Sequence, residues 1–171
     1  VLLAHQLDTP LTYEALREAG GGLGSAGFIV YDDRRNTVDM AYRVSRFLHV
    51  ESCGQCTPCK TGTMEITKAL EGLVRATVDP EDAVSTLERR LLTVTDGSRC
   101  YLPSQERNVI SSLLSADDHD LAMRLEGVPG DLDVPLPRLV DIVDGVATLD
   151  ERAELKQPDW TYGETPVQLA R

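Results

Sequence analysis

The chain has 171 residues, 42% of them apolar, which is enough for one main domain with a single hydrophobic core. It carries 28 acidic and 17 basic residues, and the resulting net charge of −11 argues against a surface that binds nucleic-acid phosphates. No apolar run approaches the roughly 20 residues that cross a bilayer, and the first residues lack the basic start of a signal peptide. We therefore expect a cytoplasmic protein without membrane insertion. Because the sequence starts at Val1 and not at methionine, we expect it to lie within a longer parent protein.

The first 36 residues combine a short predicted helix, a glycine run and an apolar segment. The helix is expected at residues 13–19, and the apolar residues 28–31 are typical of a buried strand. Between them, Gly22, Gly24 and Gly27 match the G-x-G-x-x-G pattern of dinucleotide sites. That pattern binds a pyrophosphate only when a strand precedes it and a helix follows, and here the order is reversed. We interpret the glycines as a turn and predict no nucleotide site.

Four segments with apolar residues at helical spacing come next, joined by short loops, and a further turn or two of helix is expected at residues 119–126. Each segment begins with a residue typical of a helix start. In chain order these residues are Thr37, Thr57 with Pro58, Asp79 with Pro80, and Pro103. The pattern predicts a mainly α fold, a four-helix bundle over residues 37–127.

The residue composition changes again after Gly127. Two short apolar runs at 139–143 and 146–149 flank Asp144-Gly145, a pair typical of hairpin turns. The residues that follow are polar and contain prolines, which favours an extended tail. Residues 128–171 are therefore expected to form a short β-hairpin and an extended C-terminal tail.

Cysteine spacing is the most informative feature of the sequence. Cys53, Cys56 and Cys59 lie within seven residues, and Cys100 lies far downstream. A four-iron cluster presents its irons at the corners of a tetrahedron, so a tight loop reaches three of them and a remote residue reaches the fourth. Tetrahedral zinc usually takes two separated pairs of ligands, and it remains the alternative, beside disulfides or unliganded thiols. With four thiolates no iron is open to substrate, so electron transfer is the chemistry that remains.

Neighbouring residues fit a buried anionic group. Gly54 permits the tight turn, and a helix that begins near Pro58 directs its free N–H groups at the cysteines. Lys60 either offsets the thiolate charge or is an ordinary solvated lysine. His49 is either a neighbour of the ligands or, as we expect, a partly exposed helix residue.

At these residues the chain resembles a known family, the iron-sulfur domain of the NADH-binding flavoprotein subunit of respiratory complex I, with relatives in NAD-linked formate dehydrogenases and bidirectional hydrogenases. Residues 51–63, ESCGQCTPCKTGT, are similar to that family's E-S-C-G-x-C-x-P-C-[RK]-x-G-T motif. Residues 7–11 and 24–30 resemble the end of its β-grasp domain. Two details depart from the family pattern: Tyr101-Leu102-Pro103 follows the fourth cysteine, and Ala26 stands in the glycine-rich turn.

The resemblance implies one [4Fe-4S] cluster bound by Cys53, Cys56, Cys59 and Cys100, which passes electrons from a reduced flavin to a downstream acceptor. It also implies that FMN and NADH bind only in a missing N-terminal domain or a partner, because nothing in this sequence matches that domain. Expected partners are the FMN/NADH-binding domain or subunit and another iron-sulfur subunit. The chain is then part of an NADH:quinone oxidoreductase-like enzyme and not catalytic alone. The alternatives are a zinc-stabilised interaction domain and a relative that has lost its cluster.

Overall fold

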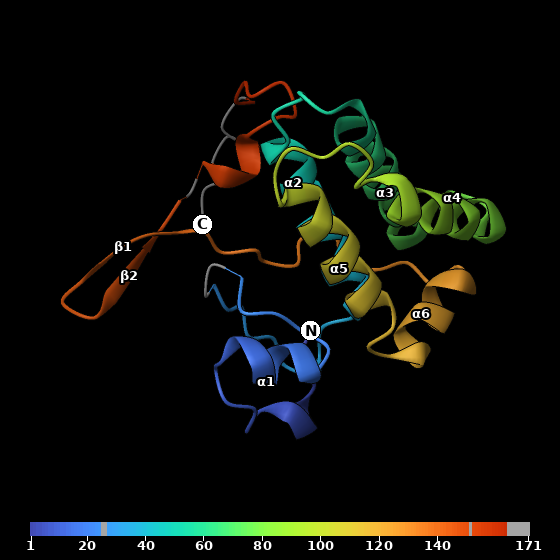
Figure 1. The fold of residues 1–171 in the computed structure, drawn as a ribbon. Helices are drawn as coiled ribbons and strands as arrows, with labels where there is room; N and C mark the ends of the chain where they lie inside the picture. The colour runs from blue at the N-terminus through green and yellow to red at the C-terminus, as the bar shows by residue number, and fades with distance from the viewer. Residues whose placement is uncertain (25–26, 151, 164–171) are drawn as a thin grey trace, which may run out of the picture.

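A computed structural model of the chain describes residues 1–24, 27–150 and 152–163, and these residues form a mainly helical protein (Figure 1). The helices are α1 (Tyr13–Glu18), α2 (Thr37–Glu51), α3 (Thr57–Arg75), α4 (Pro80–Thr93), α5 (Leu102–Leu114) and α6 (Asp118–Leu125). The strands are β1 (Leu139–Val143) and β2 (Val146–Leu149), and short 3-10 turns occur at Ala4–Gln6 and Ala153–Leu155. No described helix is both long enough and apolar enough to span a bilayer.

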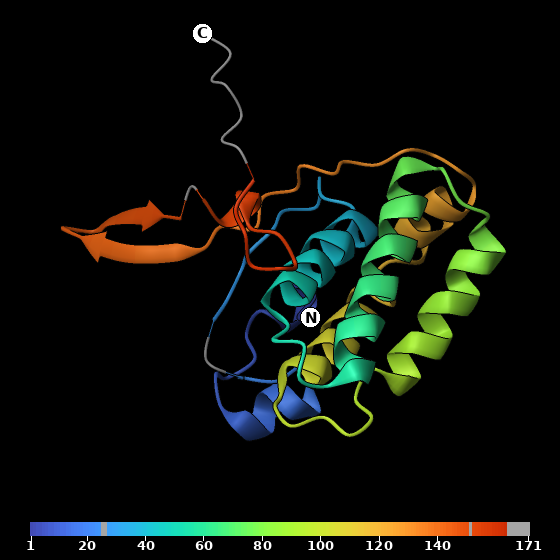
Figure 2. The same ribbon diagram turned by 90° about the horizontal axis from the view of Figure 1, so that it is seen from above.

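The predicted bundle is formed by α2, α3, α4 and α5. Figure 2 shows α2, α3 and α4 side by side, and the most extensive packing is of α2 on α3, α3 on α4 and α2 on α5. Their apolar faces meet in one core because each helix repeats apolar residues every three to four positions. The fully buried side chains of this core include Val38, Ile66, Leu70, Leu73, Val74, Val94 and Ile110.

The starts of α2, α3 and α5 differ from the predictions by one residue. Asn36, not Thr37, caps α2, because its side-chain oxygen accepts hydrogen bonds from the backbone N–H groups of Val38 and Asp39. Helices α3 and α5 likewise begin one residue earlier than expected, so that Cys56 and not Thr57 is the residue before α3. The Asp79 cap of α4 is confirmed.

The strand predicted at residues 28–31 is wrong. The segment is irregular, and the side chains of Phe28, Ile29 and Val30 are exposed. A strand needs a neighbour that pairs with its backbone N–H and C=O groups. Among residues 1–24, 27–150 and 152–163, none pairs with this segment. Ala26, named above as a departure from the family pattern, lies outside the described residues.

The predicted hairpin is confirmed. Strands β1 and β2 pair antiparallel, and both Asp144 (φ 51°) and Gly145 (φ 78°) adopt the left-handed conformation that a two-residue turn of this kind requires. The hairpin projects from the bundle in both ribbon views, and its apolar side chains are exposed on both faces (Figures 1 and 2).

The extended tail is wrong for residues 152–163. This segment turns back: Lys156 bridges to Tyr162, and Trp160 Nε1 donates a hydrogen bond of 2.9 Å to the carbonyl oxygen of Val50 at the end of α2. We call residues 156–162 the C-terminal loop. The predicted tail beyond residue 163 lies outside the described residues.

A buried ion pair ties α6 and the segment after it to α2. Arg124 of α6 donates two hydrogen bonds of 2.8 Å to the carboxylate of Asp39, and both side chains are almost completely buried. The same carboxylate accepts a hydrogen bond from the backbone N–H of Asp131. Gly130 packs so closely on the pair that an added Cβ would lie 2.3 Å from Asp39 Oδ1, which explains the need for glycine there.

Candidate metal centre

Three cysteines surround the start of α3. Cys53 and Gly54 lie in the loop between α2 and α3, Cys56 immediately precedes α3, and Cys59 lies in its first turn. Gly54 has φ 78°, a left-handed conformation that glycine adopts easily, which fits the tight turn predicted for this loop. The first N–H groups of α3 have no partner within the helix, and the positive end of the helix dipole lies at these cysteines.

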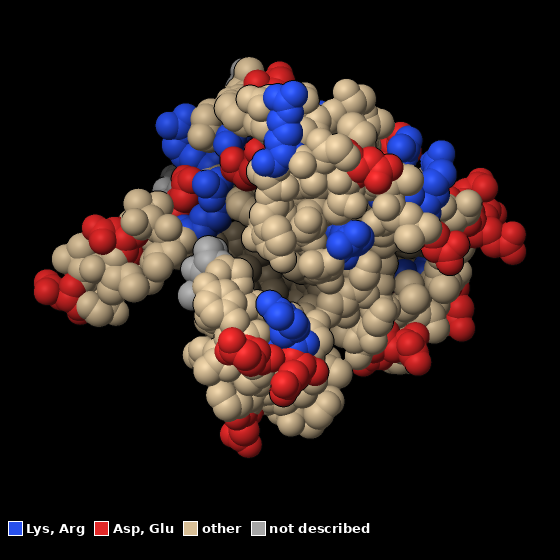
Figure 3. Space-filling model, viewed as in Figure 1, with Lys and Arg blue, Asp and Glu red and all other residues tan. Residues whose placement is uncertain are grey.

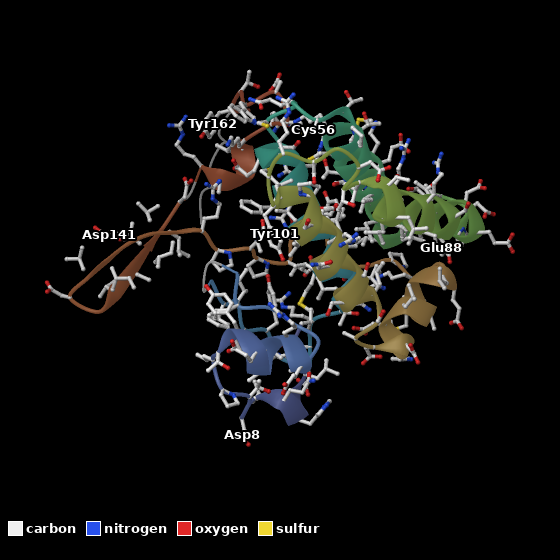
Figure 4. All side chains as sticks on the ribbon, viewed as in Figure 1. Asp8, Cys56, Glu88, Tyr101, Asp141 and Tyr162 are labelled. Carbon is white, nitrogen blue, oxygen red and sulfur yellow. The ribbon has the colours of Figure 1, made fainter. Side chains whose placement is uncertain are left out.

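Cys100 lies in a different loop from the other three cysteines. It ends the loop that connects α4 to α5, and Tyr101 is the residue before α5. Figure 2 shows this loop and the loop of residues 52–56 at the same end of the bundle, and Figure 4 labels Cys56 and Tyr101 there. All four cysteines are free thiols.

The pKa of the Cys59 thiol depends on its burial, on Ser52 and on the other three cysteines. Burial raises the pKa of the Cys59 thiol, a hydrogen bond from Ser52 lowers it in part, and Cys100, Cys56 and Cys53 raise it further. Ser52 Oγ lies 3.4 Å from Cys59 Sγ. As they stand, no three His, Cys, Asp or Glu side chains of the described residues are close enough to hold a single metal ion.

Lys60 is not a freely solvated lysine, so the structure contradicts that interpretation. Its Nζ donates hydrogen bonds to the carbonyl oxygens of His49 (3.3 Å), Ser52 (3.0 Å) and Pro158 (2.8 Å). Burial lowers the pKa of Lys60, and Cys59, Cys53 and Asp159 raise it in part. The ammonium therefore links α2 to the C-terminal loop and places a positive charge beside the thiols.

Comparison with known proteins agrees with this geometry. The family model described as "NADH-ubiquinone oxidoreductase-F iron-sulfur binding region" matches residues 39–122, a range that contains all four cysteines. Residues 39–122 belong to this family. The resemblance inferred from the cysteine motif is thereby confirmed.

Three similar relatives are all F subunits of NADH-quinone oxidoreductase. The F 1 form from Rhizobium meliloti is 42% identical over 72 residues, which are 42% of this chain and 17% of the relative. The protein from Buchnera aphidicola (subsp. Schizaphis graminum) is 34% identical over 96 residues, 56% of this chain and 21% of the relative. The protein from Rickettsia rickettsii is 39% identical over 71 residues, 42% of this chain and 17% of the relative. The matched part of this chain is thus about a fifth of the length of these relatives.

His49 lies within the matched residues 39–122. The prediction that it is partly exposed is wrong. Its side chain is buried, and Nδ1 lies 3.2 Å from Thr63 Oγ1 of α3. Burial lowers the pKa of His49 to about 4, and the charges of Lys60, Lys68 and Arg46 act in the same direction. His49 is therefore neutral at neutral pH.

The C-terminal loop covers one side of the cysteine loop. Besides the contact of Lys60 with Pro158, Lys156 Nζ lies 2.7 Å from Glu51 Oε2 at the end of α2. Ser52, Cys53 and Lys60 form a shallow depression together with Pro158, Asp159 and Trp160. Sequence reasoning missed this loop because short polar segments with proline carry no periodicity.

Basic side chains gather on this part of the surface. Figure 3 shows several Lys and Arg above the base of the hairpin, with Asp and Glu beside them. Both signs of charge occur over α4 and the N-terminal segment, and Asp and Glu lie on the hairpin. Among the basic residues are Arg138 and Lys156, which both pair with Glu51.

Glu106 is a polar residue of the core that sequence reasoning missed. Its side chain is 0% exposed, and its Oε1 lies 2.6 Å from Ser45 Oγ of α2. Burial raises the pKa of Glu106 to about 8, and the hydrogen bond with Ser45 lowers it in part. The sequence did contain a sign of this position, because Glu106 shares a helix face with Ile110 and Leu113.

Proposed function

We propose that this chain carries one [4Fe-4S] cluster, bound by Cys53, Cys56, Cys59 and Cys100, and that it relays electrons from a reduced flavin to a downstream acceptor. The observation that supports the proposal is the family match, because the matched residues 39–122 contain all four cysteines. In addition, the loop that ends at Cys100 and the loop of residues 52–56 lie at the same end of the bundle. Four thiols from two loops are a suitable donor set for the four irons of a cubane cluster. When bound, the cluster supplies one-electron transfer.

The residues of this chain have separate tasks in that role. Cys59 is the buried thiol of the set and must lose its proton on binding iron, which helix α3 favours by directing its free N–H groups and positive dipole end toward the site. Ser52 Oγ can donate a hydrogen bond to the Cys59 sulfur, and such bonds tune the potential of a cluster. Lys60 adds a positive charge that opposes the negative charge of four thiolates.

The wider system is proposed by analogy with the relatives named above. Because the chain matches only about a fifth of their length, we place FMN and NADH in a domain or subunit outside it, and the electron acceptor in another iron-sulfur subunit. On this proposal the chain is not catalytic alone and works in the cytoplasm. Residues 1–36 would be the end of a β-grasp domain, residues 37–127 the iron-sulfur domain, and residues 128–171 its C-terminal extension.

Anaerobic purification and metal analysis test the proposal. We expect brown protein whose broad visible absorbance is bleached by dithionite, with four irons and four acid-labile sulfides per chain. Colourless protein with one zinc ion would instead support the zinc-stabilised interaction domain, and protein without metal would support a relative that has lost its cluster.

Cysteine variants test the ligand set. Cys56→Ala is expected to abolish cluster assembly, because it removes a ligand from the tight loop. Cys100→Ala is expected to leave a three-iron or labile centre, because only the remote corner of the cluster is lost. Ser98→Ala, in the same loop as Cys100, is the matched control and should keep full iron content. Equal iron in the wild type and both cysteine variants would contradict the assignment.

A further inference from the structure

The proposed function gives no role to the carboxyl group of Glu106, which is buried in the core of the bundle. It lies one helical turn inside α5, and its Oε1 is 2.6 Å from Ser45 Oγ. Its Oε2 is buried and has no hydrogen-bond partner among the described residues. A buried carboxylate with an unpartnered oxygen is costly, whereas a neutral carboxylic acid in the same place costs much less.

Hydrogen-bond geometry also favours a neutral acid. Ser45 Oγ lies 2.8 Å from Thr67 Oγ1, and Thr67 Oγ1 lies 2.8 Å from the carbonyl oxygen of Thr63. Together with the contact between Ser45 and Glu106, these make a chain of three hydrogen bonds, and each needs one proton. The two hydroxyl groups supply only two protons, and the carbonyl oxygen of Thr63 can only accept. If Thr67 donates to Thr63 and Ser45 donates to Thr67, then the third proton comes from Glu106 itself.

No charged neighbour in the described part of the chain compensates a negative charge at this position. The other buried titratable groups there are Tyr42 and His49 of α2, Cys59 of α3, and the pair Asp39 and Arg124. His49 is neutral at neutral pH, and Asp39 and Arg124 pair with each other. The adjacent charge on α5, Arg107, is exposed, and burial is the cause that raises the pKa of Glu106.

The cysteine ligands lie close to this acid along each of the helices that surround it. Glu106 is six residues after Cys100 on the segment that leads into α5. Its partner Ser45 precedes the cysteine loop on α2. Thr63 and Thr67 follow Cys59 on α3 by about one and about two helical turns. A charge added at the cysteine end therefore acts on Glu106 through a protein interior of low dielectric constant.

We propose that Glu106 is a proton-binding site coupled to the oxidation state of the cluster, an inference that rests on the proposed function. One electron from a reduced flavin lowers the charge of the cluster by one, and the added negative charge favours the neutral acid. Where Glu106 is ionised in the oxidised protein, one proton from the solvent binds its carboxylate as the electron arrives. On oxidation the electron passes to the acceptor and the proton returns to the solvent.

This coupling makes the midpoint potential of the cluster depend on pH. The potential is constant below the pKa that Glu106 has in the oxidised protein, and it falls with rising pH between that pKa and the higher pKa in the reduced protein. The steepest slope for one proton per electron is about 59 mV per pH unit, because one pH unit is a tenfold change in proton activity.

Potentiometric titration of the complete chain tests the proposal, after visible absorbance and iron content have established that the cluster is present. The titration is followed optically from about pH 6 to about pH 10, a range that brackets the raised pKa expected for a buried carboxyl group. The variants are Glu106→Gln, which keeps the size and can form a hydrogen bond with Ser45 but does not titrate, and the matched control Glu88→Gln on the exposed face of α4. Redox-difference infrared spectra of the same samples report the carboxylic acid directly.

We expect the potential of the wild type and Glu88→Gln to fall with pH, and that of Glu106→Gln to be constant or nearly so. A carboxylic acid C=O band should change on reduction in the wild type and be missing in Glu106→Gln. A cluster whose potential has the same slope in the wild type and Glu106→Gln, or no slope in the wild type, would overturn this proposal and leave the proposed function standing. Failure to find any cluster would overturn both.

Discussion

Single side chains at the cysteine end of the bundle each join segments that are distant in sequence. Lys60 bonds to carbonyl oxygens of α2, of the cysteine loop and of the C-terminal loop. Glu106 joins α5 to α2 through Ser45, and His49 joins α2 to α3 through Thr63. These polar residues are buried or half-buried between helices and loops of the bundle, so we expect each of them to affect both the stability of the bundle and the environment of the thiols.

The raised pKa of Glu106 predicts how the folding stability of the bundle changes with pH. Its pKa is about 8 in the folded protein against 4.5 for the free group, so the folded state holds a proton that the unfolded state has lost between these values. The folding stability that Glu106 contributes is present below pH 4.5 and is lost as pH rises toward 8. Glu106→Gln should remove this dependence and be more stable than the wild type at pH 7, by about 3 kcal/mol.

Urea denaturation at pH 5 and pH 7.5 measures this effect. The difference in the free energy of unfolding between Glu106→Gln and the wild type should grow with pH, whereas Glu88→Gln should follow the wild type at both values. A constant difference between Glu106→Gln and the wild type would mean that Glu106 is ionised in the folded protein.

At the scale of secondary-structure elements, the sequence predicts the helices and the hairpin well and the contacts between them poorly. The helices α2 to α5 have strong periodicity and clear start residues, so their predicted positions were correct to about one residue. The hairpin was correct because Asp144-Gly145 specifies its turn locally. The strand at 28–31 was wrong because pairing depends on a neighbour, which the segment's own residues do not reveal.

In the candidate site too, some features could be predicted from the sequence and others depend on how the helices pack. The four cysteines and Gly54 could be recognised from spacing alone. The burial of His49 and the attachment of the C-terminal loop could not, because they depend on which faces of the helices meet. Glu106 is intermediate: its place on an apolar helix face was visible, but its neutral state follows only from the arrangement of Ser45 and Thr67.

The packing of α3 on the end of α4 controls the position of the Cys100 loop. Gly62 lies on α3, and an added Cβ would be 2.9 Å from Val94 Cγ2 and 3.4 Å from Val94 Cα, where that loop begins. Gly62→Ala should therefore displace the loop, cost about 1–3 kcal/mol and lower the iron content per chain. Thermal unfolding and iron analysis of the purified variant measure the two effects.

Val94→Ala provides the control for this contact. The double variant with Gly62→Ala should regain part of the iron content, because the Val94 Cγ atoms that meet the new methyl group are gone. Full iron content in Gly62→Ala itself would show that the Cys100 loop does not depend on this close approach.

At the scale of the whole molecule, the cysteine end is enclosed by segments from both halves of the chain. The bundle supplies the thiols, and the C-terminal loop covers the side of Cys53 through Trp160 and Pro158. The hairpin, in contrast, projects from the bundle and makes its main contacts within itself. The C-terminal segment thus consists of a part that belongs to the site and a part that does not.

Trp160→Ala tests the role of the C-terminal loop. It removes the hydrogen bond to Val50, worth about 1 kcal/mol, and the ring that lines the depression beside Cys53, so the visible absorbance should bleach faster in air. Trp160→Phe, which keeps an aromatic ring but lacks the N–H donor, should be intermediate. Ile142→Ala, in the exposed hairpin, should bleach at the wild-type rate, and the same bleaching rate in all four proteins would exclude a protective role.

Mössbauer spectroscopy of anaerobically reconstituted, iron-57-labelled chain tests the central claim most directly, because it reports the type of iron site and not only the amount of iron. We predict that the spectrum of the oxidised protein is that of a single [4Fe-4S] centre with sulfur ligands at every iron, and that dithionite reduces it by one electron. A spectrum of isolated iron ions, or of a three-iron centre in the wild type, would contradict the joint ligation by Cys53, Cys56, Cys59 and Cys100.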